Sequence, residues 1–445
     1  MYRVYVGDMH AVQRELHDRY GPIIRIAPNE VTTIELSAIP RIYRNQQPLK
    51  KTDFYSVWGG GNISKQLDTF TQTDEKAHSG YRRIVTPVYT LSNVLKSEDY
   101  INKHADLKIP IDLGVWLQMY AFDVIGEIFF GSMFGFLEKG EDHGEFIASL
   151  DALMPVLCIT AIGPTYLRPL IMSSAIVSPT ALRAVKALEG IRQAALAAGG
   201  KRKRDIEDGV AHRNDMLQQL FDIVREKGEK VNFSSDEATL EAYVAMFAGS
   251  DTTAVAFRAV FYHLMKNPAA LATAHNEIDM AYAAGSLSSP IKYAETTTKL
   301  PYICAVIKEA MRMHPSVGLS MQRHAPQEGL DLAGKFIPKG YRVGINPAAI
   351  HYDKSIFGPD ADEFRPERWL VSDDKWKALE RGMLIFGAGT RTCIGKNISL
   401  VELHTLVPEL LRHFDLEMAH DRPWTTQNRW FHKQIDLVVK VARRS

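Results

Sequence analysis

The longest regular pattern of apolar positions spans residues 234–267 and predicts a single helix. Ser234 and Glu237 have the spacing of a capping box at its start, and Asn267 followed by Pro268 ends it. Apolar residues occupy most faces of this helix, so we expect it to cross the core of the protein.

Further helices are predicted from Pro301 to His314 and from about Lys396 onward. Two short β segments, residues 330–332 and 341–345, flank a turn at residues 338–340. We therefore expect a mainly α fold with small β-sheets placed to one side.

Two charged stretches interrupt the apolar pattern, at residues 199–205 and 225–230, and both are interpreted as loops. The first begins with two glycines, and its basic cluster has a nuclear signal as the alternative. The apolar stretch 150–172 contains Asp151, Pro155, Pro164 and Arg168, so it predicts a pair of buried helical segments joined by a turn. The alternative for it is a surface that dips into a bilayer.

Length and composition narrow the function classes. A chain of 445 residues with 46% hydrophobic residues can bury a large core. With 53 basic and 52 acidic residues, the net charge of +1 argues against a nucleic-acid-binding protein. The 3 cysteines exclude a disulfide framework and a cysteine-rich zinc module, and they suit a reducing compartment.

The long helix contains a run of poor helix formers, residues 248–253. Gly249 leaves room for a flat ligand to approach the backbone, and nearby hydroxyl groups can bond back to the carbonyl four residues earlier. A tolerated kink or a tight helix crossing is the alternative. Asp251 beside Thr252 is an acid next to an alcohol, a pair suited to relaying protons to a molecule bound in the groove.

A second chemical signal lies in Phe386-Gly387-Ala388-Gly389-Thr390-Arg391-Thr392-Cys393-Ile394-Gly395, directly before the last helix. Glycines allow this backbone to curl sharply, and unpaired amides at a helix N-terminus stabilise a thiolate. Arg391 adds positive charge. Cys393 is therefore a candidate axial ligand for iron, whereas Cys158 and Cys304 have no such surroundings and are interpreted as core residues.

The segment resembles the cytochrome P450 signature at Phe386, Gly389, Arg391, Cys393 and Gly395. The resemblance extends in the correct order from residues 16–21 to the C-terminus. It is strongest to the fungal, pisatin-demethylase-type branch, through residues 29–31 and 120–127. It implies a single domain over residues 1–445 with the P450 fold, a long central helix over a haem, and haem b (iron protoporphyrin IX) held by Cys393.

An E-x-x-R pair is weak evidence by itself, since this chain contains it at residues 189–192, 309–312 and 409–412. Only Glu309 and Arg312 lie on a helix that precedes the β segments, as the family requires. The resemblance makes Arg368 their partner, in a structural triad that holds the loop carrying Cys393.

Residues 248–253 resemble the oxygen-activating motif of the family, which makes Thr252 and Asp251 the expected proton-delivery pair. Where many members have tryptophan four residues before an arginine, this chain has His78 before Arg82. Both can hydrogen-bond haem propionates from one helical face, with a solvated polar face as the alternative. The resemblance also implies cofactor contacts for Gly249, Arg323, Phe386, Arg391 and Gly395.

Apolar positions near these motifs are expected to line a hydrophobic substrate pocket or to belong to the core: Tyr243, Met246, Phe247, Val317, Gly318 and Leu319. The resemblance implies a monooxygenase of fungal secondary metabolism. Such an enzyme inserts one oxygen atom of O2 into a hydrophobic small molecule by hydroxylation, epoxidation or demethylation. Electrons are expected from NADPH–cytochrome P450 reductase docking near Lys396, since the chain has no flavin or nicotinamide fingerprint.

Besides His78, two further departures from the family are expected. The membrane anchor and proline-rich hinge expected before Tyr20 are absent, and the stretch between Ser97 and Leu113 is interpreted as one helix short. The family location is the cytosolic face of the endoplasmic reticulum membrane. Without the anchor, peripheral membrane contact and a soluble protein are the alternatives. The functional alternatives are a haem-thiolate isomerase or dehydratase and a decayed, non-catalytic haem protein.

Overall fold

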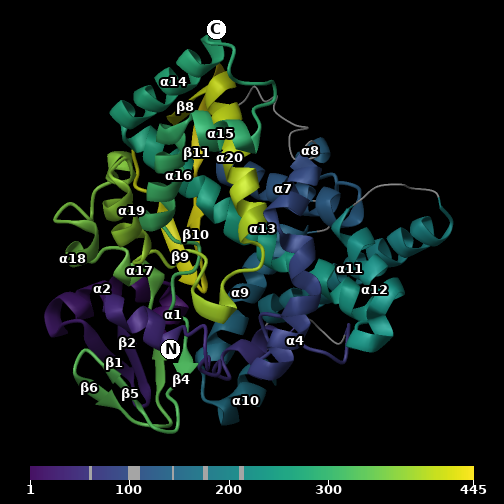
Figure 1. Ribbon diagram of the computed structural model, residues 1–445, viewed down its shortest axis with the longest axis vertical. Coiled ribbons are helices and arrows are strands. Elements are labelled where there is room, and N and C mark those ends of the chain that lie inside the picture. The colour runs from purple at the N-terminus through teal and green to yellow at the C-terminus, as the bar shows by residue number, and fades with distance from the viewer. Residues whose placement is uncertain (60–62, 99–110, 143–144, 174–178, 210–214, 445) are drawn as a thin grey trace. The chain divides into compact units, whose positions relative to one another are not determined.

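The apolar pattern over residues 234–267 folds as helix α13, Ser235–Lys266, with the predicted bounds (Figure 1). The computed structural model describes residues 1–59, 63–98, 111–142, 145–173, 179–209 and 215–444. Ser234 donates its backbone N–H to Glu237 Oε2 over 2.7 Å, so the expected cap is present. The predicted shortening between Ser97 and Leu113 falls mostly on residues 99–110, which lie outside the described ranges.

The chain divides into two units, which we describe separately. The first comprises Met1–Tyr5, Lys50–Tyr100 and Gln118–Asp251, and the second comprises Val6–Leu49, Ile101–Leu117 and Thr252–Ser445. The division therefore passes through α13, between Asp251 and Thr252.

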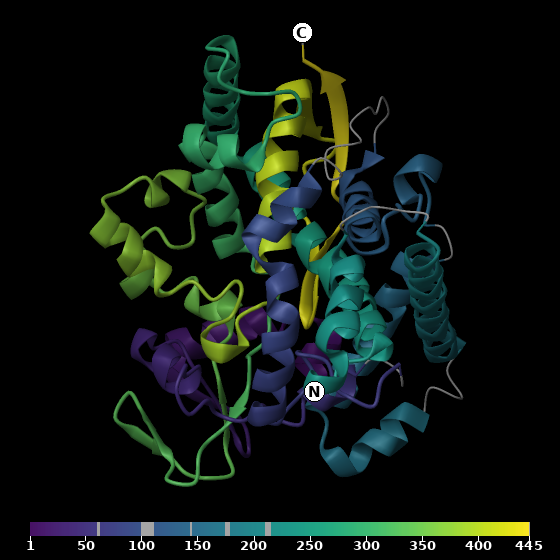
Figure 2. The same ribbon diagram turned by 45° about the vertical axis from the view of Figure 1, so that its right-hand side comes forward.

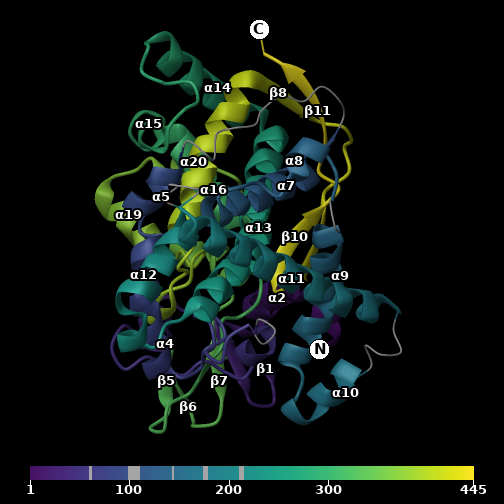
Figure 3. The same ribbon diagram turned by 90° about the vertical axis from the view of Figure 1, so that its right-hand side faces the viewer.

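Within its described residues, the first unit is helical (Figure 3). The helix α9 packs against α11, which also contacts α12. The unit contains α4 (Glu75–Val85), α5 (Leu91–Val94), α8 (Phe136–Lys139), α9 (Phe146–Ile162), α10 (Arg168–Ser173), α11 (Pro179–Glu207), α12 (Met216–Val231), most of α7 (Leu113–Ile125) and most of α1 (Tyr2–Val6).

The second unit combines helices with small sheets, and it holds every strand in the described part of the chain. Figure 2 shows the last helix, α20, with the C-terminal strands alongside it. The helices are α2 (Met9–Tyr20), α3 (Ile39–Ile42), α14 (Pro268–Ala283), α15 (Tyr293–Lys299), α16 (Pro301–Met313), α17 (Pro347–Ile350), α18 (Lys354–Phe357), α19 (Asp373–Glu380) and α20 (Lys396–His413).

The sheets join segments that are far apart in the sequence (Figure 1). One sheet has the order β1-β2-β7-β4, with β1 (Ile23–Ala27), β2 (Glu30–Thr33), β7 (Arg342–Gly344) and β4 (Arg323–His324). The others are β5 (Leu330–Leu332) with β6 (Lys335–Ile337), β10 (Phe431–Ile435) with β9 (Thr425–Arg429), and β3 (Ile111–Asp112), β11 (Val438–Arg443) and β8 (Phe414–Met418). The mainly α fold with small β-sheets is thus confirmed.

Two local predictions were wrong. Residues 199–205 and 225–230 are helical, in α11 and α12, and not loops. In α11, Gly199 allows close packing, because a Cβ there would lie 3.3 Å from Thr239 Cγ2. Arg202 is buried and donates to Asp215 over 2.7 Å, so its charge is paired inside the unit. The two predicted β segments form strands, and their partners come from other segments: β5 pairs with β6, whereas β7 pairs with β2 and β4.

The apolar stretch 150–172 forms most of α9, a turn and α10, as expected, but only the first part is buried. The helix α10 contains no buried residue. One helical stretch in the described part of the chain, Leu113–Phe130, is long and apolar enough to cross a membrane, and 89% of it is buried in the protein. Such burial is typical of a core helix.

A buried histidine, His351, connects the end of α16 to the segment that leads to Cys393. Its Nε2 accepts the N–H of Leu384 over 2.9 Å, and its Nδ1 lies 3.1 Å from the carbonyl of Arg312. Only the neutral ring, with its proton on Nδ1, makes both bonds. Burial first, and then the charge of Arg312, lower the pKa of His351 to about 3.

This pairing predicts a loss of stability in mild acid. Because the folded pKa of His351 lies below the usual 6.5, the unfolded chain binds more protons once the pH falls below about 6.5. From pH 7 to pH 5, His351 alone should cost about 2 kcal/mol of unfolding free energy. The unfolding free energy can be measured by urea unfolding followed by tryptophan fluorescence. Between pH 7 and pH 5, we expect its change in His351→Gln to differ from that of the wild type by about 2 kcal/mol, because the variant lacks this contribution.

The comparison with the variant is needed because two buried acids act in the opposite direction. Burial raises the pKa of Glu241 to about 7 and raises that of Glu402 well above the usual value. These carboxyl groups bind protons more tightly in the folded protein than in the unfolded chain. Their contribution to the unfolding free energy therefore falls as the pH rises. Equal pH dependence in wild type and His351→Gln would contradict the assigned role of His351.

Candidate active site

The segment before α20 curls tightly around two glycines. Gly387 and Gly389 have φ values of 70° and 68°, in the left-handed region that favours glycine. A Cβ on Gly389 would also lie 2.4 Å from the carbonyl oxygen of Tyr43, so no side chain fits there. The backbone N–H of Cys393 closes the curl by donating to the carbonyl of Phe386 over 2.8 Å.

This curl presents the thiol of Cys393 at an accessible surface. Cys393 is exposed, Cys304 is partly buried, and Cys158 is fully buried. Helix α20 begins three residues after Cys393, with Gly395 at its N-cap. A Cβ on Gly395 would lie 3.9 Å from the Cys393 sulfur, which is an ordinary contact. The difference in exposure separates Cys393 from Cys158, a core residue as the sequence predicts, and from the partly buried Cys304.

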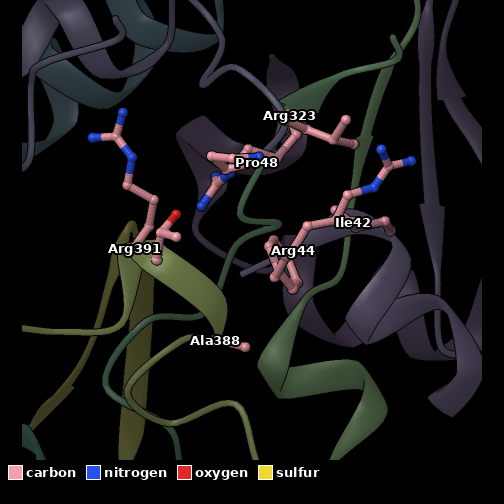
Figure 4. A pocket seen from close by; sticks show the side chains of 9 residues that line it. Ile42, Arg44, Pro48, Arg323, Ala388 and Arg391 are labelled. Carbon is pink, nitrogen blue, oxygen red and sulfur yellow. The ribbon is translucent and has the colours of Figure 1, made fainter. Parts of the chain in front are cut away.

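Two arginines for which cofactor contacts are expected, Arg323 and Arg391, line one small pocket beside this curl (Figure 4). Arg323 is 5% exposed, donates to the carbonyl of Gln322 over 2.9 Å, and lies over the ring of Tyr43. Arg391 ends the short helical turn Gly389–Arg391. The pocket thus gathers cationic groups that match carboxylate ligands.

The same pocket contains two residues that the sequence alone did not indicate, Tyr43 and Arg44. The hydroxyl of Tyr43 donates to the carbonyl of Met321 and accepts the N–H of Ile345 over 2.9 Å. In Figure 4 the guanidinium of Arg44 is directed away from Arg323 and Arg391. No local motif marks either residue, because their contact with the glycine curl arises only on folding.

The helix α13 passes through its run of poor helix formers without a break. Ser250 donates its hydroxyl to the carbonyl of Met246 over 2.8 Å, which is the predicted bond to the preceding turn. A Cβ on Gly249 would lie 2.9 Å from Ile125 Cδ1. In the first unit, therefore, Gly249 permits a tight helix crossing, the alternative that the sequence left open.

Asp251 and Thr252 differ in their surroundings. Asp251 is 3% exposed and accepts a hydrogen bond from Gln118 Nε2. Thr252 is partly exposed, and its backbone carbonyl accepts the hydroxyl of Ser316 over 2.7 Å. Ala248, one turn before Thr252, is exposed, so this face of α13 is accessible in the middle of an otherwise buried helix.

The predicted pair on α4 occupies one face, with different exposure. His78 is 2% exposed, Arg82 is partly exposed, and Arg83 is exposed and points elsewhere, as expected. The charge of Arg82 also acts on the buried Glu241, which accepts the hydroxyl of Tyr89 over 2.9 Å. Burial dominates nonetheless and raises the pKa of Glu241 to about 7.

The predicted pocket residues divide into two groups. Tyr243, Met246 and Leu319 are buried at 3%, 1% and 6% exposure, as core residues are, whereas Phe247 and Val317 are partly exposed. Gly318 is buried and closely packed, since a Cβ there would lie 2.5 Å from Asn428 Nδ2. The accessible Ala248 was not among the predicted pocket residues.

The triad of Glu309, Arg312 and Arg368 comes together in the second unit. Arg312 binds both carboxylate oxygens of Glu309 over 2.8 Å, and Arg368 Nε adds a third bond over 3.1 Å. Glu309 and Arg312 are 0% exposed, and Arg368 is 2% exposed. Burial alone would raise the pKa of Glu309, but the two arginines hold it below its usual value.

The chain is similar to known proteins over nearly its whole length. The family model for cytochrome P450 matches residues 2–440. The chain is 42% identical to the cytochrome P450 monooxygenase gsfF of Penicillium aethiopicum, over 100% of this chain and 90% of that protein. It is 39% identical to the cytochrome P450 monooxygenase ACRTS1 of Alternaria alternata, over 82% and 99%, and 32% identical to pisatin demethylase of Fusarium vanettenii, over 100% and 86%.

Removing the charge at the centre of the triad should be strongly destabilising. In Glu309→Gln, two buried arginines lose their carboxylate, which typically costs about 3–5 kcal/mol. The matched control is Glu189→Gln, since Glu189 pairs with Arg192 at the same spacing on an exposed surface. Urea unfolding should separate the two variants clearly, and equal stabilities would contradict a structural role for the buried triad.

Proposed function

The chain belongs to the cytochrome P450 family and is a haem-thiolate monooxygenase, and we propose that Cys393 is the axial ligand of its haem b. The observation that carries this proposal is the exposed thiol on the glycine curl before α20. The residues fit the cofactor: they offer the thiol of the exposed Cys393 and a pocket lined by one buried and two partly buried arginines. When bound, a haem with a thiolate ligand supplies the chemistry of O2 activation.

We propose that Arg323 and Arg391 bind propionate groups from their shared pocket, with His78 and Arg82 of α4 as further donors. Charge and donor geometry support the arginines. Phe386, Gly395 and Gly249 would shape the surroundings of the cofactor. For Gly249, the contact with Ile125 supports close helix packing more directly than contact with a ligand.

We propose that Thr252 and Asp251 deliver protons during O2 activation. Thr252 lies on the accessible face of α13, and Asp251 is buried and held by Gln118. A buried acid next to an accessible alcohol can replace a proton that the alcohol donates. In this scheme Gln118 orients the carboxylate.

The substrate is proposed to be a hydrophobic small molecule of fungal secondary metabolism. Phe247 and Val317 are the predicted pocket residues that remain accessible, and Ala248 adds a small apolar side chain. Tyr243, Met246, Gly318 and Leu319 would act behind them as packing. The relatives are named monooxygenases or a demethylase, which gives no support to an isomerase, a dehydratase or a decayed protein.

Monooxygenases of this family act with O2 and a redox partner. We propose NADPH–cytochrome P450 reductase as that partner, docking near Lys396 at the start of α20. We also propose that residues 1–445 form a single P450 domain, which the family match over residues 2–440 supports.

The proposed location is the cytosolic face of the endoplasmic reticulum membrane, with peripheral contact. Three large apolar side chains next to and within α10 support this proposal. Tyr166, Leu170 and Met172 are 79%, 68% and 42% exposed. Side chains of this type insert readily into the interfacial region of a bilayer.

The axial ligand can be tested by spectroscopy. The reduced carbon monoxide complex of the wild type should show the Soret band of a thiolate-ligated haem, and Cys393→Ala should lose that band. The variants Cys158→Ala and Cys304→Ala serve as controls and should keep it. Retention of the thiolate band in Cys393→Ala would overturn the assignment.

Proton delivery can be tested by the ratio of product formed to NADPH consumed. Thr252→Ala removes the hydroxyl, and general acid–base groups typically contribute about 100-fold or more to such steps. We expect the ratio to fall at least about tenfold, with hydrogen peroxide released in place of product. An unchanged ratio would exclude Thr252 from proton delivery.

A further inference from the structure

The backbone carbonyl of Thr252 has an unusual partner for a helical position. Ser316, in the segment that follows α16, donates its hydroxyl to this oxygen over 2.7 Å. The two residues are 64 positions apart in the sequence, and both belong to the second unit. A carbonyl in a helix normally accepts the amide four residues later, and its second lone pair is available to a donor outside the helix.

Ser316 is itself held by the β9–β10 hairpin. Its backbone carbonyl accepts the N–H of His432 over 2.9 Å. One residue further on, Val317 forms an isolated bridge with Phe431. The N–H of Gly318 then donates to the carbonyl of Trp430 over 3.1 Å. Residues 316–318 therefore run along the hairpin like an additional short strand.

The hairpin is in turn bonded to the helical turn after Thr252. Gln434 Nε2 donates to the carbonyl of Val255 over 3.2 Å, and Arg258 Nη1 donates to the carbonyl of Gln434 over the same distance. Hydrogen bonds thus form a closed ring that joins three segments: the start of α13 in this unit, residues 316–318 and strand β10. Within that ring, the side-chain bond from Ser316 is the one made to Thr252 itself.

The close fit of this ring leaves little freedom to its members. A Cβ on Gly318 would lie 2.5 Å from Asn428 Nδ2, so the segment after Ser316 is packed directly against the hairpin. Since the side chain of Thr252 is attached to the backbone that Ser316 holds, the position of the threonine hydroxyl depends on this bond.

We propose that Ser316 is a positioning residue that fixes the turn of α13 carrying Thr252 and couples it to the β9–β10 hairpin. This inference rests on the proposed role of Thr252 in proton delivery. Ser316 acts through the backbone of Thr252, and a shift of the hairpin is transmitted to the threonine through Ser316. Ser316 was not indicated by the sequence, where it is one of several serines near apolar residues.

The primary test is a double-mutant cycle on the ratio of product to NADPH consumed. Ser316→Ala should lower the ratio about threefold to tenfold, the range expected for one hydrogen bond. Ser316→Thr retains the hydroxyl and should restore it. In the Thr252→Ala background, Ser316→Ala should have little additional effect. If Ser316→Ala folds poorly, Ser316→Cys provides a weak donor of similar volume.

The matched control is Ser56→Ala. Ser56 also donates its hydroxyl to a backbone carbonyl over 2.7 Å, that of Asp53, and it is exposed. Its removal should leave the ratio unchanged. Equal effects of Ser316→Ala in the wild-type and Thr252→Ala backgrounds would overturn the inference, as would a wild-type ratio in Ser316→Ala. If Thr252→Ala alone has no effect, the proposed role of Thr252 fails, and the inference with it.

A measurement without turnover tests the structural link separately. Amide hydrogen exchange in Ser316→Ala should accelerate in peptides covering residues 253–258 and 431–435, relative to wild type and Ser316→Thr. Peptides from α14 should exchange at the wild-type rate. Unchanged exchange in residues 253–258 would show that Ser316 does not hold this turn, and it would overturn the inference even with an intact role for Thr252.

Discussion

The second unit depends on the neutralisation of one buried carboxylate, that of Glu309. A charge taken out of water is tolerated only when opposite charges and hydrogen bonds replace its hydration. Arg312 and Arg368 provide them, and Trp369 Nε1 adds a bond to Glu309 over 2.9 Å. Because these partners come from α16 and from the short turn Pro366–Trp369, satisfying one charge brings two distant segments together.

The same network reaches the segment that carries Cys393. Arg312 Nη1 donates to the carbonyl of His351 over 2.7 Å, and His351 accepts the N–H of Leu384, two residues before Phe386. The curl that exposes Cys393 therefore starts from a backbone anchored, through one neutral histidine, to the buried ion pairs. Stability and the presentation of the proposed axial ligand thus have a common physical origin.

Much of this could be predicted from local pattern. The bounds of α13 and α16 and the start of α20 follow from periodicity and capping, and residues 386–395 carry their own backbone signals in two glycines. Predictions failed where tertiary contacts outweigh local preference. Residues 199–205 appear loop-like because of glycines and charges, yet Arg202 finds Asp215 and Gly199 packs on Thr239. Strand β7 pairs with β2, more than 300 residues away, a partner that no local turn indicates.

The sequence by itself determined the family and the cofactor, and it indicated the cysteine that we propose as the ligand, because a short motif contains these signals locally. The tertiary structure alone decided which predicted residues are accessible. Tyr243 and Met246 are buried while Ala248 is exposed, since the exposed face of a helix that is apolar on most sides depends on its neighbours. It also decided the partners of single groups, such as Tyr43 at Gly389 and Ser316 at Thr252, because hydrogen bonds between distant segments leave no pattern in the sequence.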